Sequence, residues 1–232
     1  MNKEIQEAQE RLEEKRKVMK PNTLLTQNTD ELDKIISDAR EKSLSVEWPQ
    51  EEEKEDKRDY EREKLISMKI PPKYYASSFE TFKGNAGLVV AVKEIKHSAM
   101  LQGKTGCGKT HLAMAWLKEK PIGMVVSIPE LLLKLRGSFR DDATLTEGQI
   151  IDRYSSIPYL VLDDLGAEKS TEFSIASLYL IIERRINTEV PTLITTNLTL
   201  AEIEHKLSAR IASRLSEMKI IKINMPDYRK KR

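Results

Sequence analysis

A glycine-rich run has the spacing of a loop that binds phosphate groups. Residues 103–110 read Gly-Lys-Thr-Gly-Cys-Gly-Lys-Thr and fit the pattern G-x-x-x-x-G-K-[ST]. Glycines let several backbone N–H groups point at one anion, and the helix that follows adds its positive dipole end. In such a loop Lys109 bridges the β and γ phosphates, and the Thr110 hydroxyl binds Mg²⁺. We expect an ATP-binding set of Gly103, Thr105, Gly106, Cys107, Gly108, Lys109, Thr110 and His111.

The segments on both sides of this run suit a phosphate loop. Residues 99–101, Ala-Met-Leu, are typical of a short buried strand, and residues 110–117 are typical of a helix. A bare match to the pattern can arise by chance, whereas a strand before it and a helix after it are the context that the motif requires.

Two aspartates follow a second apolar segment. Residues 159–162, Tyr-Leu-Val-Leu, are typical of a strand buried on both faces of a parallel sheet, and Asp163 and Asp164 come directly after it. Open α/β sheets bind ligands at the carboxyl ends of their strands. We expect Asp163 to complete the Mg²⁺ shell and Asp164 to orient or deprotonate the attacking water. The alternative is an apolar strand that runs into a polar turn at Leu165-Gly166.

A strand predicted over residues 191–197 also ends in polar groups. In nucleotidases with an inserted central strand, a polar residue at this position contacts the γ-phosphate and the water, and Asn197 is the candidate. Asn197 could instead cap the helix predicted from Leu198 to Leu207, although Thr199 can also fill that role.

The composition favours one ordinary domain with a smaller appendage. The chain has 232 residues, of which 39% are hydrophobic and 33% charged. Its apolar runs are far shorter than the ~20 residues that span a bilayer, and no apolar leader follows Met1. The single cysteine excludes an internal disulfide and a cysteine-based zinc site. We expect a protein of the reducing cytoplasm that makes no contact with a membrane.

Charge and proline positions divide the chain. Residues 1–66 carry 14 Lys/Arg and 19 Asp/Glu, whereas residues 67–232 carry 25 and 18. The first part is typical of charged amphipathic helices, and Pro71-Pro72 marks a boundary. We predict a helical region at 1–66, a linker at 67–83 and a nucleotide domain at 84–232. The aromatic cluster after the prolines either covers the adenine ring or docks the linker: Tyr74, Tyr75, Phe79 and Phe82.

From residue 84 onward, predicted strands alternate with predicted helices. The strands are expected at 99–101, 122–128, 159–162, 191–197 and 220–223. The helices are expected at 88–96, 110–117, 129–139, 147–154, 172–187, 201–207 and 209–218. This alternation predicts an α/β fold, with a parallel sheet covered by helices on both faces.

Several stretches resemble one family. Residues 163–168, 191–198 and 209–215 read Asp-Asp-Leu-Gly-Ala-Glu, Pro-Thr-Leu-Ile-Thr-Thr-Asn-Leu and Ala-Arg-Ile-Ala-Ser-Arg-Leu. Together with Phe-Glu-Thr-Phe at 79–82 and Pro-Asp-Tyr-Arg at 226–229, they resemble the bacterial replicative-helicase loaders of the DnaC/DnaI type, which are AAA+ ATPases. The resemblance covers roughly residues 70–229. IstB-type transposition helper ATPases share much of the pattern.

The resemblance implies an AAA+ P-loop NTPase domain whose ATP site is completed by an adjoining copy. Arg214 would be the arginine finger offered to that copy, so that hydrolysis requires self-association. Arg210, one helical turn earlier, is the reserve candidate, and a basic helix face in water is the alternative. Arg229 matches a second, cis-acting sensor arginine, or belongs to a basic tail.

The resemblance also implies partners. These would be a hexameric replicative helicase of the DnaB type, gripped by residues 1–66, and single-stranded DNA. Arg184 and Arg185 are candidates for the DNA contact, with a solvated face or a contact between subunits as alternatives.

Two departures from the family pattern are visible. Asp164 stands where AAA+ enzymes usually carry Glu, which predicts slow turnover, and the amino-terminal zinc cysteines of the DnaI type are absent. A compact loader with a divergent helicase-binding part would suit a bacteriophage or another mobile element.

The sequence therefore predicts an ATP-dependent loader that places a helicase on single-stranded DNA. The rival interpretations are a transposition helper that acts on double-stranded DNA and a transposase, a small-molecule P-loop kinase, and an ATP-binding adaptor that does not hydrolyse ATP.

Overall fold

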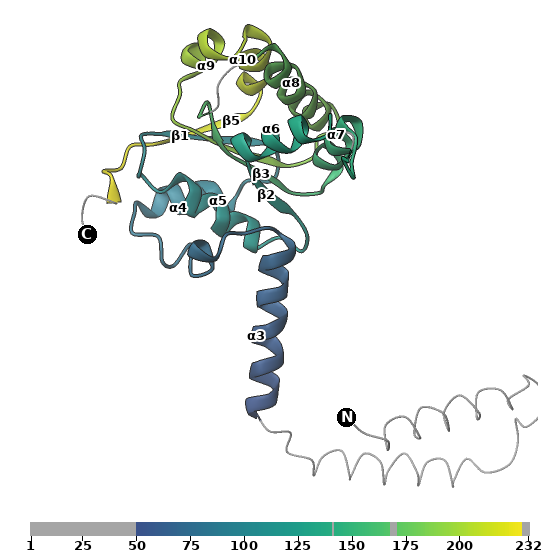
Figure 1. The fold of residues 1–232 in the computed structure, drawn as a ribbon. Helices are drawn as coiled ribbons and strands as arrows, with labels where there is room; N and C mark the ends of the chain where they lie inside the picture. The colour runs from purple at the N-terminus through teal and green to yellow at the C-terminus, as the bar shows by residue number, and fades with distance from the viewer. Residues whose placement is uncertain (1–49, 141, 168–170, 229–232) are drawn as a thin grey trace, which may run out of the picture. The chain divides into compact units, whose positions relative to one another are not determined.

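The computed structural model describes residues 50–140, 142–167 and 171–228. The fold set out below is that of the compact unit that begins at Asp56 (Figure 1). The helices predicted within residues 1–49 and the candidate sensor residue Arg229 lie outside the described residues.

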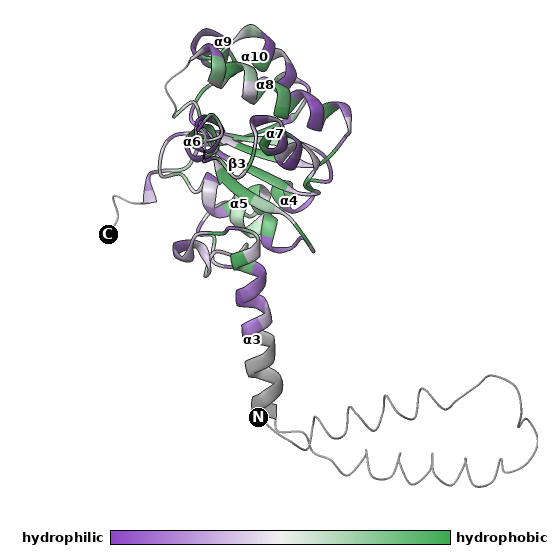
Figure 2. Ribbon diagram, turned by 45° about the vertical axis from the view of Figure 1, so that its right-hand side comes forward, coloured by the Kyte–Doolittle hydropathy of each residue, from purple (hydrophilic) through white to green (hydrophobic). Residues whose placement is uncertain are grey.

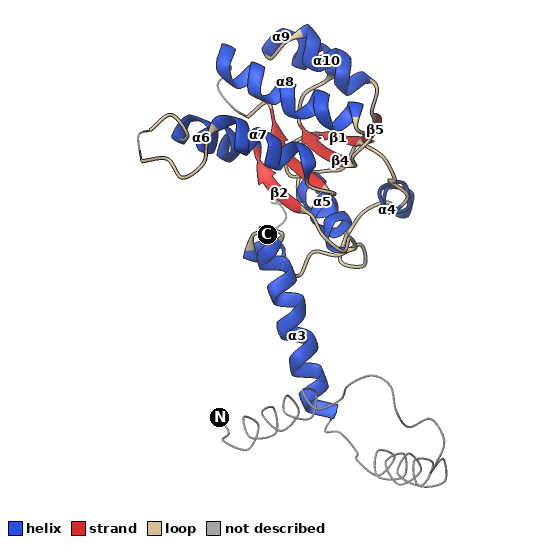
Figure 3. Cartoon of the chain, turned by 90° about the vertical axis from the view of Figure 1, so that its right-hand side faces the viewer, coloured by secondary structure: helices blue, strands red, loops and turns tan. Residues whose placement is uncertain are grey.

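A five-stranded parallel sheet forms the centre of this unit. Its strands are β1 (Ala99–Gly103), β2 (Met124–Ser127), β3 (Leu160–Leu165), β4 (Thr192–Thr196) and β5 (Lys219–Ile223). Their order across the sheet is β2-β3-β4-β1-β5, and every neighbouring pair is parallel (Figure 3). The predicted parallel sheet is confirmed, and β4 is a central strand inserted between β1 and β3.

Helices pack on both faces of the sheet, as predicted. Those that contribute to the cores are α4 (Ala86–Lys93), α5 (Lys109–Lys118), α6 (Ile128–Gly137), α7 (Glu147–Ser156), α8 (Glu172–Asn187), α9 (Leu200–Lys206) and α10 (Ala209–Ser216). Helix α3 (Gln50–Ser67) and a short 3₁₀ turn at Pro72–Tyr74 precede them in the chain. One apolar core takes its residues from α6 to α10, and a second takes its residues from α4 and α5.

The strands feed both cores because successive side chains point to opposite faces. In β1, Met100 belongs to the core under α6 to α10, while Leu101 belongs to the core under α4 and α5. Leu162 and Val161 divide in the same way in β3. The strands are accordingly the most hydrophobic part of the ribbon (Figure 2). This explains why β1 and β3 begin as continuous apolar runs, Ala-Met-Leu and Leu-Val-Leu.

Polar side chains set where several helices begin. Ser127 accepts a hydrogen bond from the N–H of Glu130 at the start of α6, and Ser208 caps α10. Thr146 forms a capping box with Gln149 at α7, and Thr199 forms one with Glu202 at α9. Because Thr199 caps α9, Asn197 is left for another role.

The segment 67–83, predicted as a linker, contributes to the core on the α5 side of the sheet. Four of its apolar side chains are buried there, namely Met68, Ile70, Phe79 and Phe82. The Val125 N–H donates to the Met68 carbonyl at 3.0 Å, and the Lys118 ammonium donates to the carbonyls of Tyr75 and Ser77. Residues ahead of β1 therefore support the helix that follows the phosphate loop.

None of the helices in the described part of the chain combines the length and the apolar character that crossing a bilayer requires.

Candidate nucleotide-binding site

The glycine-rich run forms the turn between β1 and α5, which confirms the predicted strand–loop–helix order. Gly106 and Gly108 have φ angles of 78° and 95°, a left-handed conformation that side chains disfavour. Gly103 lies so close to β5 that a Cβ there would come within 2.4 Å of the Ile223 carbonyl oxygen. The glycine spacing therefore follows from backbone geometry, and α5 starts with its N–H groups toward the loop.

Lys109 brings the phosphate loop and the end of β4 together. Its ammonium donates to the carbonyls of Gly103 and Lys104, both at 2.9 Å, and to Asn197 Oδ1 at 2.6 Å. The side chain is 5% exposed. Asn197 thus reaches the loop, as a residue expected to contact the γ-phosphate must.

Thr110 and Asp163 meet beside the loop. The Thr110 hydroxyl donates to Asp163, with distances of 3.0 Å to Oδ1 and 3.3 Å to Oδ2. Burial raises the pKa of the Asp163 carboxyl, and the neighbouring charge of Asp164 adds to this, while hydrogen bonds from Thr195 and Thr110 oppose it. A hydroxyl and a carboxylate so close together are the hard oxygen ligands that Mg²⁺ takes, so the residues present fit this ion.

Asp164 is exposed at the carboxyl end of β3 and has a φ of 61°. A bulge interrupts the pairing of β3 with β4 at this point. Left-handed conformations at residues other than glycine concentrate at functional sites. The strand therefore continues to Leu165, beyond the predicted end, and presents Asp164 to the cavity beside the loop.

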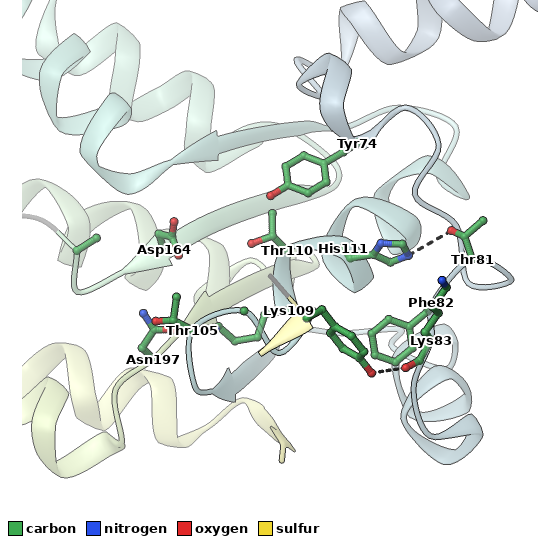
Figure 4. Close-up of a pocket in the computed structure, with 14 residues that line it drawn as sticks. Tyr74, Thr81, Phe82, Lys83, Thr105, Lys109, Thr110, His111, Asp164 and Asn197 are labelled. Carbon is green, nitrogen blue, oxygen red and sulfur yellow. Dashed lines mark hydrogen bonds between the residues drawn. The ribbon is translucent and has the colours of Figure 1, made fainter. Parts of the chain in front are cut away.

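A cavity of about 1130 Å³ opens above the loop (Figure 4). This volume is slightly above the range of about 300–1,000 Å³ that is usual for small-molecule pockets, so a nucleotide has room in it. Its lining comes from Tyr74, Thr81, Phe82, Lys83, Thr105, Gly106, Gly108, Lys109, Thr110, His111, Asp164, Ala167, Asn197 and Tyr228.

Three of the predicted residues contribute from behind this lining. Gly103 ends β1, Asp163 lies under Thr110, and the fully buried Cys107 side chain packs beneath the loop. The aromatic cluster also divides. Tyr74 and Phe82 line the cavity, and Phe79 is buried in the core.

A family model matches the part of the chain that contains most of this cavity's lining. Residues 86–232 match the family described as IstB-like ATP binding protein, which is more than half of the chain. The chain belongs to the IstB-like ATP-binding family. The phosphate loop, Asp163 and Asn197 all lie within the matched residues.

Several proteins similar to this chain are named replicative helicase loader DnaC. A protein named replicative helicase loader DnaC from Buchnera aphidicola subsp. Baizongia pistaciae is 26% identical over 176 residues, covering 68% of this chain and 71% of its own. The protein of that name from Escherichia coli K12 is 27% identical over 123 residues, which is 51% of this chain and about half of its own length, 49%.

A solved DnaC helicase loader structure matches with a TM-score of 0.57 and 25% identity, covering 66% of this chain and 100% of that one. The predicted AAA+ fold and the predicted resemblance to helicase loaders are thereby confirmed.

The end of the described chain forms one wall of the cavity. The Tyr228 N–H donates to the Gly106 carbonyl at 3.1 Å, and the Tyr228 hydroxyl donates to the Lys83 carbonyl. Asp227 lies against the same glycine, because a Cβ on Gly106 would come within 1.8 Å of Asp227 Oδ1. The sequence signalled residues 226–229 only through the family resemblance.

The candidate finger Arg214 lies on α10 and is engaged by its own chain. Its guanidinium donates to Glu183 Oε1 and to Glu217 Oε1, both at 2.8 Å. These bonds, that to Glu217 first, raise the pKa of Arg214. Arg214 does not line the cavity of its own subunit. Arg210 is exposed, with no polar partner among the described residues.

Arg185 corrects one prediction. Its side chain is 0% exposed, and burial lowers its pKa to about 10. The guanidinium donates to the Thr192 hydroxyl at 2.7 Å and to four carbonyls at the end of α7 and the start of β4: those of Tyr154, Ser155, Ile157 and Pro191. The prediction that Arg185 contacts DNA is therefore wrong, because the buried side chain cannot reach a nucleic acid. Arg184, beside it, pairs with Asp152 at the surface.

Sequence reasoning missed Thr195. Its hydroxyl donates to Asp163 Oδ1 at 2.6 Å and accepts from the Asp164 N–H at 3.0 Å. A signal was available, because β4 carries three threonines and is buried along its whole length. Buried hydroxyls must find hydrogen-bond partners, and here the partners belong to the site.

Proposed function

We propose that this protein is an ATP-dependent loader that binds a hexameric replicative helicase of the DnaB type and helps to place it on single-stranded DNA. One observation carries the proposal. The chain combines a phosphate-binding edge with 68% coverage by a relative named replicative helicase loader DnaC. The alignment with the Escherichia coli K12 protein covers about half of that protein, 49%, so we propose the loader activity for this chain from the site and the alignment together.

ATP is the proposed ligand of the cavity. The loop N–H groups and Lys109 bind its phosphates, and Thr110 and Asp163 hold Mg²⁺. A bound Mg²⁺ ion would neutralise charge on the β and γ phosphates. Lys109 exchanges its bonds to loop carbonyls and Asn197 for the phosphate oxygens, which frees the Asn197 amide to contact the γ-phosphate.

Asp164 orients or deprotonates the attacking water in this proposal. Its carboxylate is exposed toward the cavity and belongs to a strained part of the backbone. Aspartate is one methylene shorter than the usual glutamate, so we expect slow hydrolysis. ATP then acts mainly as a switch between assembly states.

Self-association completes the site. Arg214 lies outside the cavity of its own subunit, and we propose that it reaches the γ-phosphate in the adjoining copy. To do so it must exchange Glu183 and Glu217 for the phosphate. An isolated subunit is therefore expected to bind ATP without turning it over.

Single-stranded DNA is the proposed nucleic-acid partner, and an aromatic pair offers a surface for it. Phe139 is 63% exposed, and its ring lies 5.3 Å from that of Phe173 in an edge-to-face contact. Two exposed arginines, Arg136 and Arg140, lie close to Phe139 in the sequence, and Arg140 pairs with Asp142 at 3.2 Å. Bases stack on aromatic rings while cations follow the phosphates, and each stacked base contributes about 1–3 kcal/mol.

Residues 1–66 are the proposed helicase contact, and the cytoplasm is the proposed place of action.

The test measures, in vitro and in the presence of ATP, whether the protein loads a DnaB-type helicase onto single-stranded DNA. Lys109→Ala should lower hydrolysis by about 10²–10³-fold and stop the ATP-dependent step. Lys104→Ala is the matched control, because Lys104 lies in the same loop with an exposed side chain. Phe139→Ala should weaken DNA binding with nucleotide binding unchanged. A protein that neither co-purifies with helicase nor changes its loading contradicts the proposal.

A transposition helper is the second candidate, favoured by the family description itself. Such a protein would act on double-stranded DNA and a transposase. Co-purification with a transposase, together with a preference for duplex over single-stranded DNA, would favour this function over helicase loading.

A further inference from the structure

We propose that Thr195 is a positioning residue that aims both aspartates of the site through one hydroxyl group. The inference deepens the proposed function and rests on it, because it concerns the same Mg²⁺-dependent nucleotide site. It assigns a role to a residue of β4 that faces neither solvent nor the cavity.

The strand pairing places Thr195 opposite both acids. In the register between β3 and β4, Leu162 pairs with Ile194 and Leu165 pairs with Thr196. Asp163 and Asp164 therefore stand together against the single residue Thr195. An extra residue in one strand leaves part of the ladder unpaired and bends that strand.

The Thr195 hydroxyl takes the place of one ladder contact, that of the Asp164 N–H, and also reaches the Asp163 side chain. It accepts the Asp164 N–H at 3.0 Å and donates its own proton to Asp163 Oδ1 at 2.6 Å. A hydroxyl has one donor and two acceptor positions, so both bonds form at once. Thr195 is 0% exposed, so water has no access to take over either bond.

These bonds have separate consequences for the two acids. The bond to Oδ1 fixes the plane of the Asp163 carboxylate beside the Thr110 hydroxyl, which itself lies 3.0 Å from the same oxygen. The bond from the Asp164 N–H holds the bulge in which Asp164 has its left-handed φ of 61°. Thr195 thus joins the metal-binding acid to the water-orienting acid.

Thr196 provides a matched comparison within the same strand. It is also 0% exposed, and its hydroxyl donates to the Leu165 carbonyl and accepts from the Leu198 N–H. It contacts neither aspartate through these bonds. Removing its hydroxyl therefore reproduces the general cost of losing a buried threonine hydroxyl from β4.

The experiment measures ATP affinity by calorimetry over a Mg²⁺ titration and in EDTA, with melting temperatures recorded alongside. Outer-shell partners of metal ligands typically change metal affinity 10–100-fold. Thr195→Val should raise the Mg²⁺ concentration needed for half-maximal effect by about 10-fold or more and leave affinity in EDTA unchanged. Thr195→Ser should restore the wild-type requirement. Thr196→Val should lower the melting temperature and leave the Mg²⁺ requirement as it was.

A Thr195→Val protein with the wild-type Mg²⁺ requirement overturns the inference, as does an equal shift in Thr196→Val. If Thr195→Val melts below the assay temperature, Thr195→Ala takes its place under the same criteria. Wild-type protein whose ATP affinity ignores Mg²⁺ would overturn the proposed nucleotide site itself, which is a separate result from a failure of Thr195 alone.

Discussion

The carboxyl edge of the sheet and the face formed by α8 and α10 use charged residues in different ways. At the edge, Lys109 and Asp163 are partly or wholly buried, yet both lie beside one cavity. On the helices, Arg185 holds the end of α7 to the start of β4, and Arg214 is bound by acids of its own chain. The spacing of a motif predicts a residue's role where the local backbone forms the site, as it does for Lys109. The role of a charged residue on a helix depends on the elements that pack against it, as it does for Arg185 and Arg214.

The largest expected effect separates the two regions by function. Arg214→Ala should lower the stimulated ATP turnover by about 10³-fold or more, since trans-acting arginines contribute 10³–10⁵-fold. It should leave ATP affinity unchanged, because Arg214 lies outside its own cavity. The measurement is turnover against protein concentration, with helicase and single-stranded DNA present, beside calorimetric binding.

Arg210→Ala is the control for this prediction, because Arg210 lies one turn earlier on the same helix and is exposed. If Arg210→Ala abolishes the stimulated ATP turnover and Arg214→Ala retains it, Arg210 is the arginine finger. Wild-type turnover that is independent of protein concentration would contradict the completion of the site by an adjoining copy.

The next effect concerns stability. Arg185→Ala leaves four carbonyls and the Thr192 hydroxyl without their donor. We expect a loss of about 3 kcal/mol or more in the free energy of unfolding, measured in urea. Arg184→Ala removes only a surface pair with Asp152 and should cost less than about 1 kcal/mol. Equal effects of the two substitutions would show that Arg185 is not a structural residue.

The smallest expected effect is a change in the melting temperature caused by the partly buried Asp163 carboxylate at the sheet edge. Burial raises the pKa of Asp163, so the folded state binds a proton at this carboxyl more strongly than the unfolded state does. Its contribution to stability therefore grows as pH falls through the raised pKa and is lost above it. Asp163→Asn, which stays neutral, should melt higher than wild type at neutral pH without nucleotide and lose the Mg²⁺ dependence of ATP binding. A lower melting temperature would contradict this assignment of the cause.

Local patterns predicted the elements of the fold and the residues of the phosphate edge. The loop at 103–110, the strand before Asp163 and the strand before Asn197 each carry their own signal, and parallel strands bring their carboxyl ends to one edge. The burial of Arg185 could not be predicted, because it depends on carbonyls about 30 positions away that only the tertiary fold collects. The role of Thr195 depends on a register shift that periodicity does not encode.

Tyr228 connects the end of the described chain to the nucleotide pocket, through the Gly106 carbonyl on one side and the Lys83 carbonyl on the other. The backbone of Tyr228 therefore contacts the loop, and the residue lines the cavity. Tyr228→Trp would install an intrinsic fluorophore at the mouth of the pocket, and its emission would give an optical signal for ligand entry in unlabelled protein.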